Sequence, residues 1–310
     1  MPIHLNGYFC GMNKAKIWIS AFRLRTLPLS MSGIIFGSAV AFSQGFWNAS
    51  IFIFACTTTL CFQVLSNLAN DLGDHLKGTD NEERVGPTRA TQSGEITANQ
   101  MKNAVIVFIV LSILSAGALI YLSSQSMSSD IIMFYVLLGV ASIVAALLYT
   151  LGKKAYGYHG LGDIFVFVFF GLVSVLGVYN LYSPFFDFHN VYPAIGLGLL
   201  STAVLNLNNL RDHVNDKKMN KNTLVVKLGI AKAKVYHTFL ILGAFLSFLL
   251  FFLQTNKYTF LVVLLFIPLL FHLKKVLGET EMTNLDPELK KVALLTFFIS
   301  LSTGIILILF

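Results

Sequence analysis

Long apolar runs, separated by short polar segments, dominate the pattern of this 310-residue chain. A helix needs ~20 mostly apolar residues to cross the hydrocarbon core of a bilayer. About nine runs meet this requirement, and they lie near residues 26–43, 49–69, 104–122, 131–151, 161–181, 191–209, 236–254, 258–273 and 293–310. The pattern therefore predicts an all-α membrane protein with about nine transmembrane helices in a bundle.

The composition supports this fold class, because 55% of the residues are hydrophobic and only 12% are charged. A soluble surface needs far more charge, so ordinary soluble, fibrous and disordered proteins are excluded. We expect a single polytopic domain over residues 1–310. Outside the helices, the sequence predicts a cytosolic or interfacial lead-in at 1–25 and two large cytoplasmic loops at 70–103 and 210–235.

The basic residues lie almost entirely on one side of the apolar runs. Of the 22 Lys and Arg residues, all except Lys257 fall in the lead-in or in every second connecting segment. Cytoplasmic segments of membrane proteins carry such an excess, so we place the amino terminus in the cytoplasm and the carboxyl terminus outside. The net charge of +7 then indicates a lipid bilayer rather than a nucleic-acid partner. The predicted location is the cell (inner) membrane, as a multi-pass protein.

Two clusters of amides and carboxylates stand at the cytoplasmic ends of the second and sixth runs. Helical spacing places the members of each cluster on one face of its helix: Asn67, Asp71 and Asp74 in the first, Asn208, Asp212 and Asp216 in the second. An even number of runs separates the clusters, so both open on the same side of the membrane. We expect them to face one another across one cavity, and ionisable residues at membrane depth are candidates for function.

Both clusters offer oxygen ligands without a local pair of His or Cys, which suits a hard cation. Mg²⁺ usually binds through one or two carboxylates together with substrate phosphates. The predicted ligands of two Mg²⁺ ions around a diphosphate are Asp71, Asp74, Asp80, Asp212 and Asp216. The basic residues that can neutralise the remaining charge are Lys77, Arg84, Arg89, Arg211, Lys217 and Lys221. The alternatives are two solvated acidic loops, or the cation sites of a transporter.

These segments resemble the motifs of the UbiA superfamily of intramembrane prenyltransferases. The resemblance rests on Asn70-Asp71-Leu-Gly-Asp74-His-Leu-Lys77-Gly78-Thr-Asp80, Arg84-Val-Gly86-Pro87-Thr-Arg89, and Asn208-Asn209-Leu-Arg211-Asp212 with Asp216. Members have about nine transmembrane helices and two Asp-rich motifs that bind Mg²⁺ and a prenyl diphosphate. The resemblance implies Mg²⁺ as the cofactor and catalytic roles for Asp71, Asp74, Asp212, Asp216 and Arg89.

One departure from the superfamily pattern narrows the expected substrate. His75 stands where many members have a further Asp, and this resembles the subgroup that acts on 1,4-dihydroxy-2-naphthoate. The resemblance implies transfer of a polyprenyl group from polyprenyl diphosphate to this aromatic acid, with loss of CO₂, to give demethylmenaquinone. Another acceptor, such as 4-hydroxybenzoate or homogentisate, is the alternative within the enzyme class.

Further polar residues are assigned to substrate binding. They are Asn67, Asn70, Lys77, Asp80, Arg84, Asn208, Arg211 and Lys221 in or beside the clusters, and Arg23, Arg25, Tyr149 and Lys153 elsewhere. Arg23 and Arg25 are expected either to anchor the acceptor carboxylate or to cap the first helix at the interface. Lys153 either contributes to the site or serves as a topology signal.

Cysteine labelling from the two sides of the membrane tests the predicted topology. Single cysteines are expected to react from outside at positions 44, 130 and 257, and from the cytoplasm at positions 84, 218 and 281. A cytoplasmic reaction at position 130 would contradict the nine-span arrangement.

Overall fold

The computed structural model describes residues 14–80 and 85–310, and within these ranges nine helical segments are long and apolar enough to cross a membrane. The all-α prediction is therefore confirmed. The first four spans are α1 (Lys14–Phe22) with η1 (Leu24–Thr26) and α2 (Leu27–Ser43), α3 (Ala49–Leu76), α4 (Ala98–Ser123) and α5 (Ser129–Leu148). The others are α6 (Gly162–Phe167) with η4 (Val168–Gly177) and α7 (Val178–Tyr182), α8 (Val191–Lys218), α10 (Ile230–Phe252), η6 (Lys257–Phe266) with α11 (Ile267–Gly278), and α12 (Asp286–Leu309).

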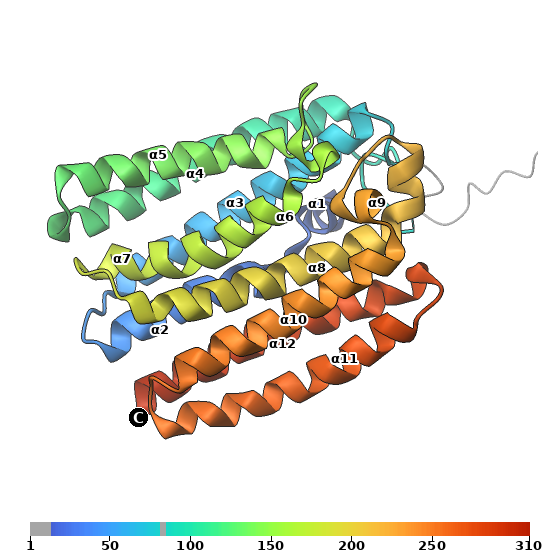
Figure 1. Ribbon diagram of the computed structural model, residues 1–310. Coiled ribbons are helices and arrows are strands. Elements are labelled where there is room, and N and C mark those ends of the chain that lie inside the picture. The colour runs from blue at the N-terminus through green and yellow to red at the C-terminus, as the bar shows by residue number, and fades with distance from the viewer. Residues whose placement is uncertain (1–13, 81–84) are drawn as a thin grey trace, which may run out of the picture.

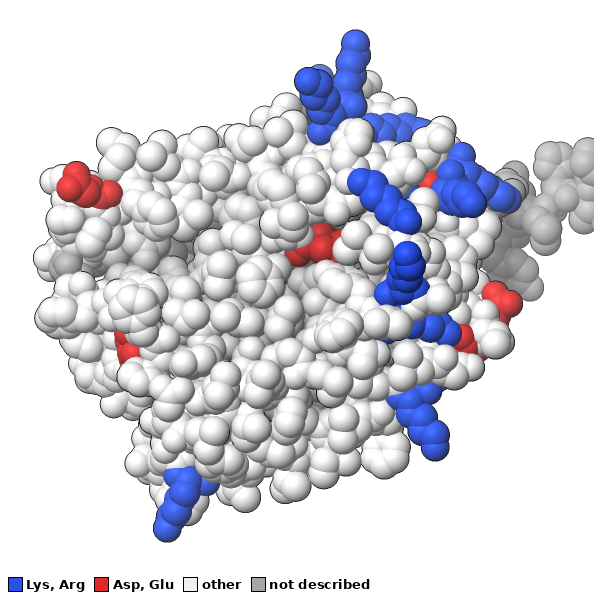
Figure 2. Space-filling model, viewed as in Figure 1, with Lys and Arg blue, Asp and Glu red and all other residues white. Residues whose placement is uncertain are grey.

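Short elements connect several spans. They are η2 (Ser124–Ser126), η3 (Tyr156–His159), η5 (Phe188–Asn190), α9 (Leu224–Leu228) and η7 (Met282–Leu285). In Figure 1 the long helices run alongside one another, with α1 and α9 near one end of the bundle and the carboxyl terminus at the opposite end. Most of the Lys and Arg side chains visible in Figure 2 gather at the end that carries α9.

The two acidic clusters are helical and do not lie in loops. α3 continues to Leu76 and α8 to Lys218, so the connecting segments begin later than the expected 70–103 and 210–235. The apolar runs end near 69 and 209 because polar side chains follow, yet the backbone hydrogen bonding of each helix continues past these positions. Asp71, Asp74, Asp212 and Asp216 thus stand on helical extensions, whereas Asp80 lies in the connection that follows α3.

The sixth span, α8, forms the centre of the bundle. In its most apolar stretch 67% of the residues are buried, against 6% in that of α5, which is therefore a peripheral helix. α8 packs against α10, α12, α6 and η4. Small residues allow this close packing: a Cβ atom on Gly171 of η4 would lie 2.5 Å from the Ala194 carbonyl oxygen and 2.6 Å from the Gly198 Cα.

A second, smaller core holds the first acidic cluster in place. It packs α1, α3, the start of α4 and the loop between α3 and α4 around Leu65, Leu68 and Met101, which are fully buried. Phe22 at the end of α1 stacks edge-on against Phe108 of α4, with ring centroids 5.3 Å apart. This core fixes the position of α1 relative to the end of α3.

Replacing Gly171 by Ala is expected to destabilise the protein by about 1–3 kcal/mol, because the new methyl group meets backbone atoms that cannot rotate away. The matched control is Gly117→Ala in α4, where a Cβ meets nothing within 4 Å and helix propensity favours Ala. The apparent melting temperatures of the two variants in detergent measure the expected difference in stability. Equal melting temperatures for both variants would contradict the close contact between η4 and α8.

Candidate active site

The ends of α3 and α8 come together at one end of the bundle, as the sidedness of the two clusters predicted. The Asn215 side-chain amide donates a hydrogen bond to the Thr79 carbonyl oxygen at 3.1 Å. The Lys221 Nζ lies 3.5 Å from the Asp74 Oδ2. Residues about 140 positions apart in the sequence are therefore in direct contact.

Arg89 joins three carboxylates of the first cluster. Its Nη1 pairs with Asp71, its Nη2 lies 3.2 Å from Asp74 and its Nε lies 3.0 Å from Asp80. The Arg89 side chain and all three carboxylates are almost wholly buried. Buried carboxylates repel one another unless cations compensate them, and the guanidinium offers several donors in a fixed plane. Arg89 therefore stabilises the convergence of the first cluster.

Arg23 reaches Asp71 from the other side, at the junction of α1 and η1. Its backbone is left-handed, with φ 51° and ψ 48°, a conformation that side chains with a Cβ rarely adopt. The Asn67 amide donates to the neighbouring Phe22 carbonyl at 3.0 Å. Asn67 thus ties this junction to α3, and Arg23 is directed at the carboxylate.

Tyr158, in η3 between the fourth and fifth spans, contacts the first cluster and Lys221, which follows α8. Its hydroxyl donates to the Asp74 Oδ1 at 2.8 Å and lies 2.5 Å from the Thr79 hydroxyl. The ring centroid lies 3.8 Å from the Lys77 Nζ and 5.3 Å from the Lys221 Nζ. Sequence reasoning missed Tyr158, because a lone tyrosine in a loop carries no spacing signal.

Burial and neighbouring charges shift the pKa values of Tyr158 and Lys77. Burial raises the pKa of Tyr158 above its ordinary value, and nearby Asp74 raises it further. The hydroxyl therefore remains a neutral donor. Burial also lowers the pKa of Lys77, an effect that Asp74 opposes and Lys221 reinforces.

The second cluster is organised around Arg211, which is 5% exposed. Its Nε and Nη2 lie 2.8 and 2.7 Å from the two Asp212 carboxylate oxygens. It also donates to the Asn208 side chain at 2.8 Å and to Asp286, at the start of α12, at 2.5 Å. Arg211 therefore pairs within its own cluster, whereas the first cluster receives its cations from other segments. Asp216 is buried on the same helix.

Some predicted site residues make no ion pair or side-chain hydrogen bond to these carboxylates within the described part of the chain. Lys153 and Lys217 are exposed, and Lys153 makes no ion pair among the residues that the structure describes. Tyr149 lines the apolar cavity described below, and Arg25 lines a second cavity. Arg84 lies outside the described residues.

The chemistry of the first cluster suits a hard cation. Asn70, next to Asp71, has a buried Oδ1 with no hydrogen-bond partner among the described residues, and the same holds for the Oδ1 of Asn215 on α8. Amide and carboxylate oxygens are the ligand type that Mg²⁺ prefers, and a buried oxygen without a partner is expected to have one when a ligand binds. Within residues 14–80 and 85–310, no group of three His, Cys, Asp or Glu side chains is arranged to hold an ion alone. A bound ion would therefore share its coordination with ligands from elsewhere, such as phosphate oxygens.

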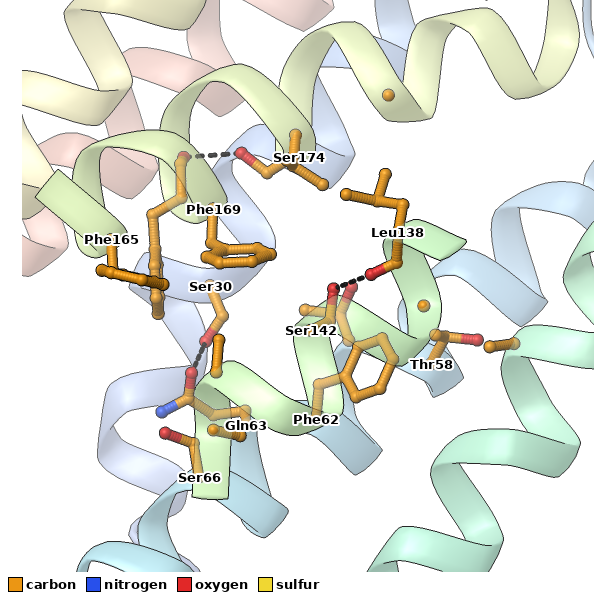
Figure 3. A pocket seen from close by; sticks show the side chains of 18 of the residues that line it. Ser30, Thr58, Phe62, Gln63, Ser66, Leu138, Ser142, Phe165, Phe169 and Ser174 are labelled. Carbon is orange, nitrogen blue, oxygen red and sulfur yellow. Dashed lines mark hydrogen bonds between the residues drawn. The ribbon is translucent and has the colours of Figure 1, made fainter. Parts of the chain in front are cut away.

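An apolar cavity of about 360 Å³ extends from this end of the bundle between α3, α5 and the fifth span. Asn67, Asn70 and Tyr149 line its polar end, and Val178 and Leu181 line it farther along the fifth span. In Figure 3 Phe62 of α3 and Phe165 and Phe169 of the fifth span lie around it. The α5 wall consists largely of small residues, namely Gly139, Ser142, Ala145 and Ala146. Large side chains there would fill the cavity.

The fifth span contributes to this cavity through an unusual helix. Residues Val168–Gly177 form a π-helix, a wider form that is rare and frequent at functional sites. Several of its residues, including Phe169, Val173 and Gly177, line the cavity. The wider helix thus forms a long part of the cavity wall.

Comparison with known proteins gives matches over most of the chain. The sequence model of the UbiA prenyltransferase family matches residues 30–306. A 1,4-dihydroxy-2-naphthoate octaprenyltransferase from Haemophilus influenzae is 43% identical over 293 residues, which cover 93% of this chain and 94% of that protein. The 1,4-dihydroxy-2-naphthoate octaprenyltransferase of Escherichia coli is 43% identical over 240 residues, 77% of each chain.

Solved structures show the same fold. A UbiA homolog from Archaeoglobus fulgidus bound to GPP and Mg²⁺ matches with a TM-score of 0.65 at 15% identity, over 93% of this chain and 99% of that one. The same homolog bound to DMAPP and Mg²⁺ matches with a TM-score of 0.64.

Replacing Tyr158 by Phe is expected to destabilise the protein by about 1–3 kcal/mol, because Asp74 loses a buried donor while the ring still packs against both lysines. The raised pKa keeps the hydroxyl protonated in the folded state, so its contribution is complete below the ordinary Tyr pKa of 10.0. It is lost only as the pH rises above that value. The effect should therefore be equal at about pH 7 and about pH 9.

Unfolding in mixed micelles measures this difference, with Tyr121→Phe as the control. Tyr121 is 78% exposed, and its hydroxyl makes no hydrogen bond within the described part of the chain. A Tyr158→Phe variant as stable as this control would contradict the bond to Asp74.

Proposed function

Since this chain belongs to the UbiA prenyltransferase family, we propose that it transfers a polyprenyl group from polyprenyl diphosphate to 1,4-dihydroxy-2-naphthoate in menaquinone biosynthesis. The observation that carries the proposal is a buried cluster of carboxylates and cations on the same helix end as Asn67 and Asn70, which line an apolar cavity. A substrate with a charged head and a hydrocarbon tail needs both environments side by side. The 43% identity to the naphthoate octaprenyltransferases supports the choice of acceptor.

The diphosphate binds at the end of α3, between the two clusters. Asp71, Asp74 and Asp80, with Asp212 and Asp216 from α8, are the carboxylates that would hold Mg²⁺ there, and Asn70 offers a further oxygen. Bound Mg²⁺ supplies positive charge to the leaving diphosphate. Lys77 and Lys221, on the two faces of the site joined by Tyr158, add two further cations. Arg89 orients the carboxylates as a group.

The prenyl tail occupies the apolar cavity. Its first units meet Phe62, Phe165 and Phe169, whose ring faces attract positive charge. The C–O bond between the prenyl group and the diphosphate breaks, and both electrons leave with the diphosphate. The electron-rich ring of the acceptor then forms a bond to the allylic carbon, and its carboxylate departs as CO₂. Demethylmenaquinone is formed in its quinol state, with no net release of a proton.

The membrane setting follows from the same chemistry. An allylic cation reacts with water, so the reaction requires a cavity from which water is excluded, and an apolar cavity between membrane-spanning helices suits this requirement. We place the single domain in the cell (inner) membrane with the amino terminus in the cytoplasm, because the basic residues gather at the end that carries the clusters. The soluble acid then reaches the site from the cytoplasm.

The test is mass spectrometry of products from the purified protein in lipid vesicles. Incubation with Mg²⁺, a polyprenyl diphosphate and 1,4-dihydroxy-2-naphthoate is expected to yield the prenylated, decarboxylated product. Parallel incubations replace the acceptor with 4-hydroxybenzoate or homogentisate. If only one of these other acids gives a product, the protein is still a prenyltransferase but acts on a different acceptor. If no acid gives a product, the proposal is refuted.

Replacing either Asp71 or Asp212 by Ala is expected to reduce turnover by about 10²-fold or more, because each removes a carboxylate from the site where charge develops on the leaving group. Asp130→Ala, an exposed residue at the start of α5, is the control and should retain activity. Amounts of inserted protein are measured in parallel. Near-normal turnover by either variant at saturating Mg²⁺ would refute the two-cluster site.

A further inference from the structure

Arg211 is shared between two carboxylates that belong to different helices. Its Nε and Nη2 contact both oxygens of Asp212 on α8, and Nη2 also contacts the Asn208 side chain. Its Nη1 reaches Asp286 at the start of α12, 75 positions further along the chain. A guanidinium has five N–H donors in one plane, which allows such sharing. Asp212 is a predicted metal ligand, whereas Asp286 lies outside both acidic clusters.

The two carboxylates lie in very different surroundings. The Asp212 side chain is 8% exposed and that of Asp286 is 52% exposed. Asp286 is also the first residue of α12, and the start of a helix favours negative charge. Its carboxylate is therefore stable in water without an arginine, whereas the buried Asp212 needs a close cation. The contact with Asp286 consequently matters for the position of Arg211 more than for the charge of Asp286.

A metal ion at Asp212 would compete with Arg211. Both oxygens of this carboxylate already accept hydrogen bonds from the guanidinium, and two cations about 4 Å apart repel one another. At least one of these hydrogen bonds must weaken before Asp212 can become a ligand. The bond between Nη1 and Asp286 involves a different nitrogen, so it can persist while Nε and Nη2 leave Asp212.

The arginine of the first cluster is placed differently. Arg89 contacts Asp71, Asp74 and Asp80, and each of these side chains is at most 2% exposed. Arg211 instead joins a buried carboxylate to a half-exposed one. The half-exposed carboxylate gives Arg211 an anionic partner outside the predicted set of metal ligands.

We propose that Asp286 is a positioning residue that retains Arg211 when Asp212 becomes a metal ligand. The proposal rests on the proposed function and adds to it a residue from α12. With Asp286 present, the guanidinium exchanges one carboxylate for another. Without it, the guanidinium would leave Asp212 for the neutral amide of Asn208 alone, and the pair with Asp212 would persist. Asp286 thereby raises the metal affinity of the second cluster.

Mn²⁺ binding, measured by electron paramagnetic resonance, tests this role without turnover. Mn²⁺ takes the same oxygen ligands as Mg²⁺, and the protein is saturated with the unreactive thiolo analogue of geranyl diphosphate. Asp286→Asn is expected to raise the Kd for Mn²⁺ about threefold to tenfold, and Asp286→Glu should recover part of the loss. The control is Glu281→Gln, which removes the same charge from an exposed position five residues earlier and should leave the Kd unchanged.

A double-mutant cycle separates an effect through Arg211 from a direct effect of the Asp286 charge. If Asp286 acts through Arg211, Asp286→Asn should not change the Kd for Mn²⁺ further in an Arg211→Gln background. Arg211→Lys is a second background in case Arg211→Gln inserts poorly. A lysine keeps the charge but cannot contact both carboxylates in one plane, so the effect of Asp286→Asn should shrink there too.

Three outcomes would overturn the proposal: equal Kd values for the wild type and Asp286→Asn, an equal loss of affinity in every Arg211 background, or no Mn²⁺ binding by the wild type. These outcomes are distinct from a failure of the proposed function. If the wild type converts no acid while Asp286 and Arg211 remain coupled in Mn²⁺ binding, the function fails and the role of Asp286 stands. If product forms while Asp286→Asn binds Mn²⁺ as the wild type does, the function stands and the role of Asp286 fails.

Discussion

The burial of carboxylates at the end of a membrane-embedded bundle is the constraint on which the site depends. Asp71 and Asp74 are each 1% exposed, and charge in such surroundings is tolerated only with close partners. Arg89 supplies one guanidinium to three carboxylates, and Arg23 and Lys221 approach from two other segments. The loop after α3, the junction after α1 and the segment after α8 are thereby held to one point. The same charges that stabilise these contacts are the ones that a cation and a diphosphate would engage.

The packing of the helices explains how a polar site and an apolar cavity lie next to each other. α8 is enclosed by its neighbours, and glycines at its contact with η4 let the two backbones approach closely. On the other side α5 is peripheral and carries small residues toward the cavity. Tight packing around α8 fixes the second cluster, and looser packing beside α5 leaves the apolar cavity. The π-helix of the fifth span lies between these two regions, packed on α8 and lining the cavity.

The two acidic clusters differ in where their compensating charge comes from. Asp212 is paired with Arg211 of the same helix, and Arg211 also donates to Asp286 and Asn208. Asp74 instead depends on Arg89, Lys221 and Tyr158, which come from three separate connections. The second cluster is therefore organised largely by α8 itself. The first is organised by the tertiary structure, and it adjoins both cavities.

Hydropathy and helical spacing alone determined the nine spans, the common side of the two clusters and the shared face of Asn67, Asp71 and Asp74. These are local properties, because the length of an apolar run and the helical period are read from neighbouring residues. The sequence did not reveal that Arg89 bridges three carboxylates, that Arg211 pairs with Asp286, or that Tyr158 contacts Asp74 across 84 positions. Those contacts, and the two cavities, arise only when small residues let particular helices pack together. No periodicity records which distant side chains then meet, so only the tertiary structure decided them.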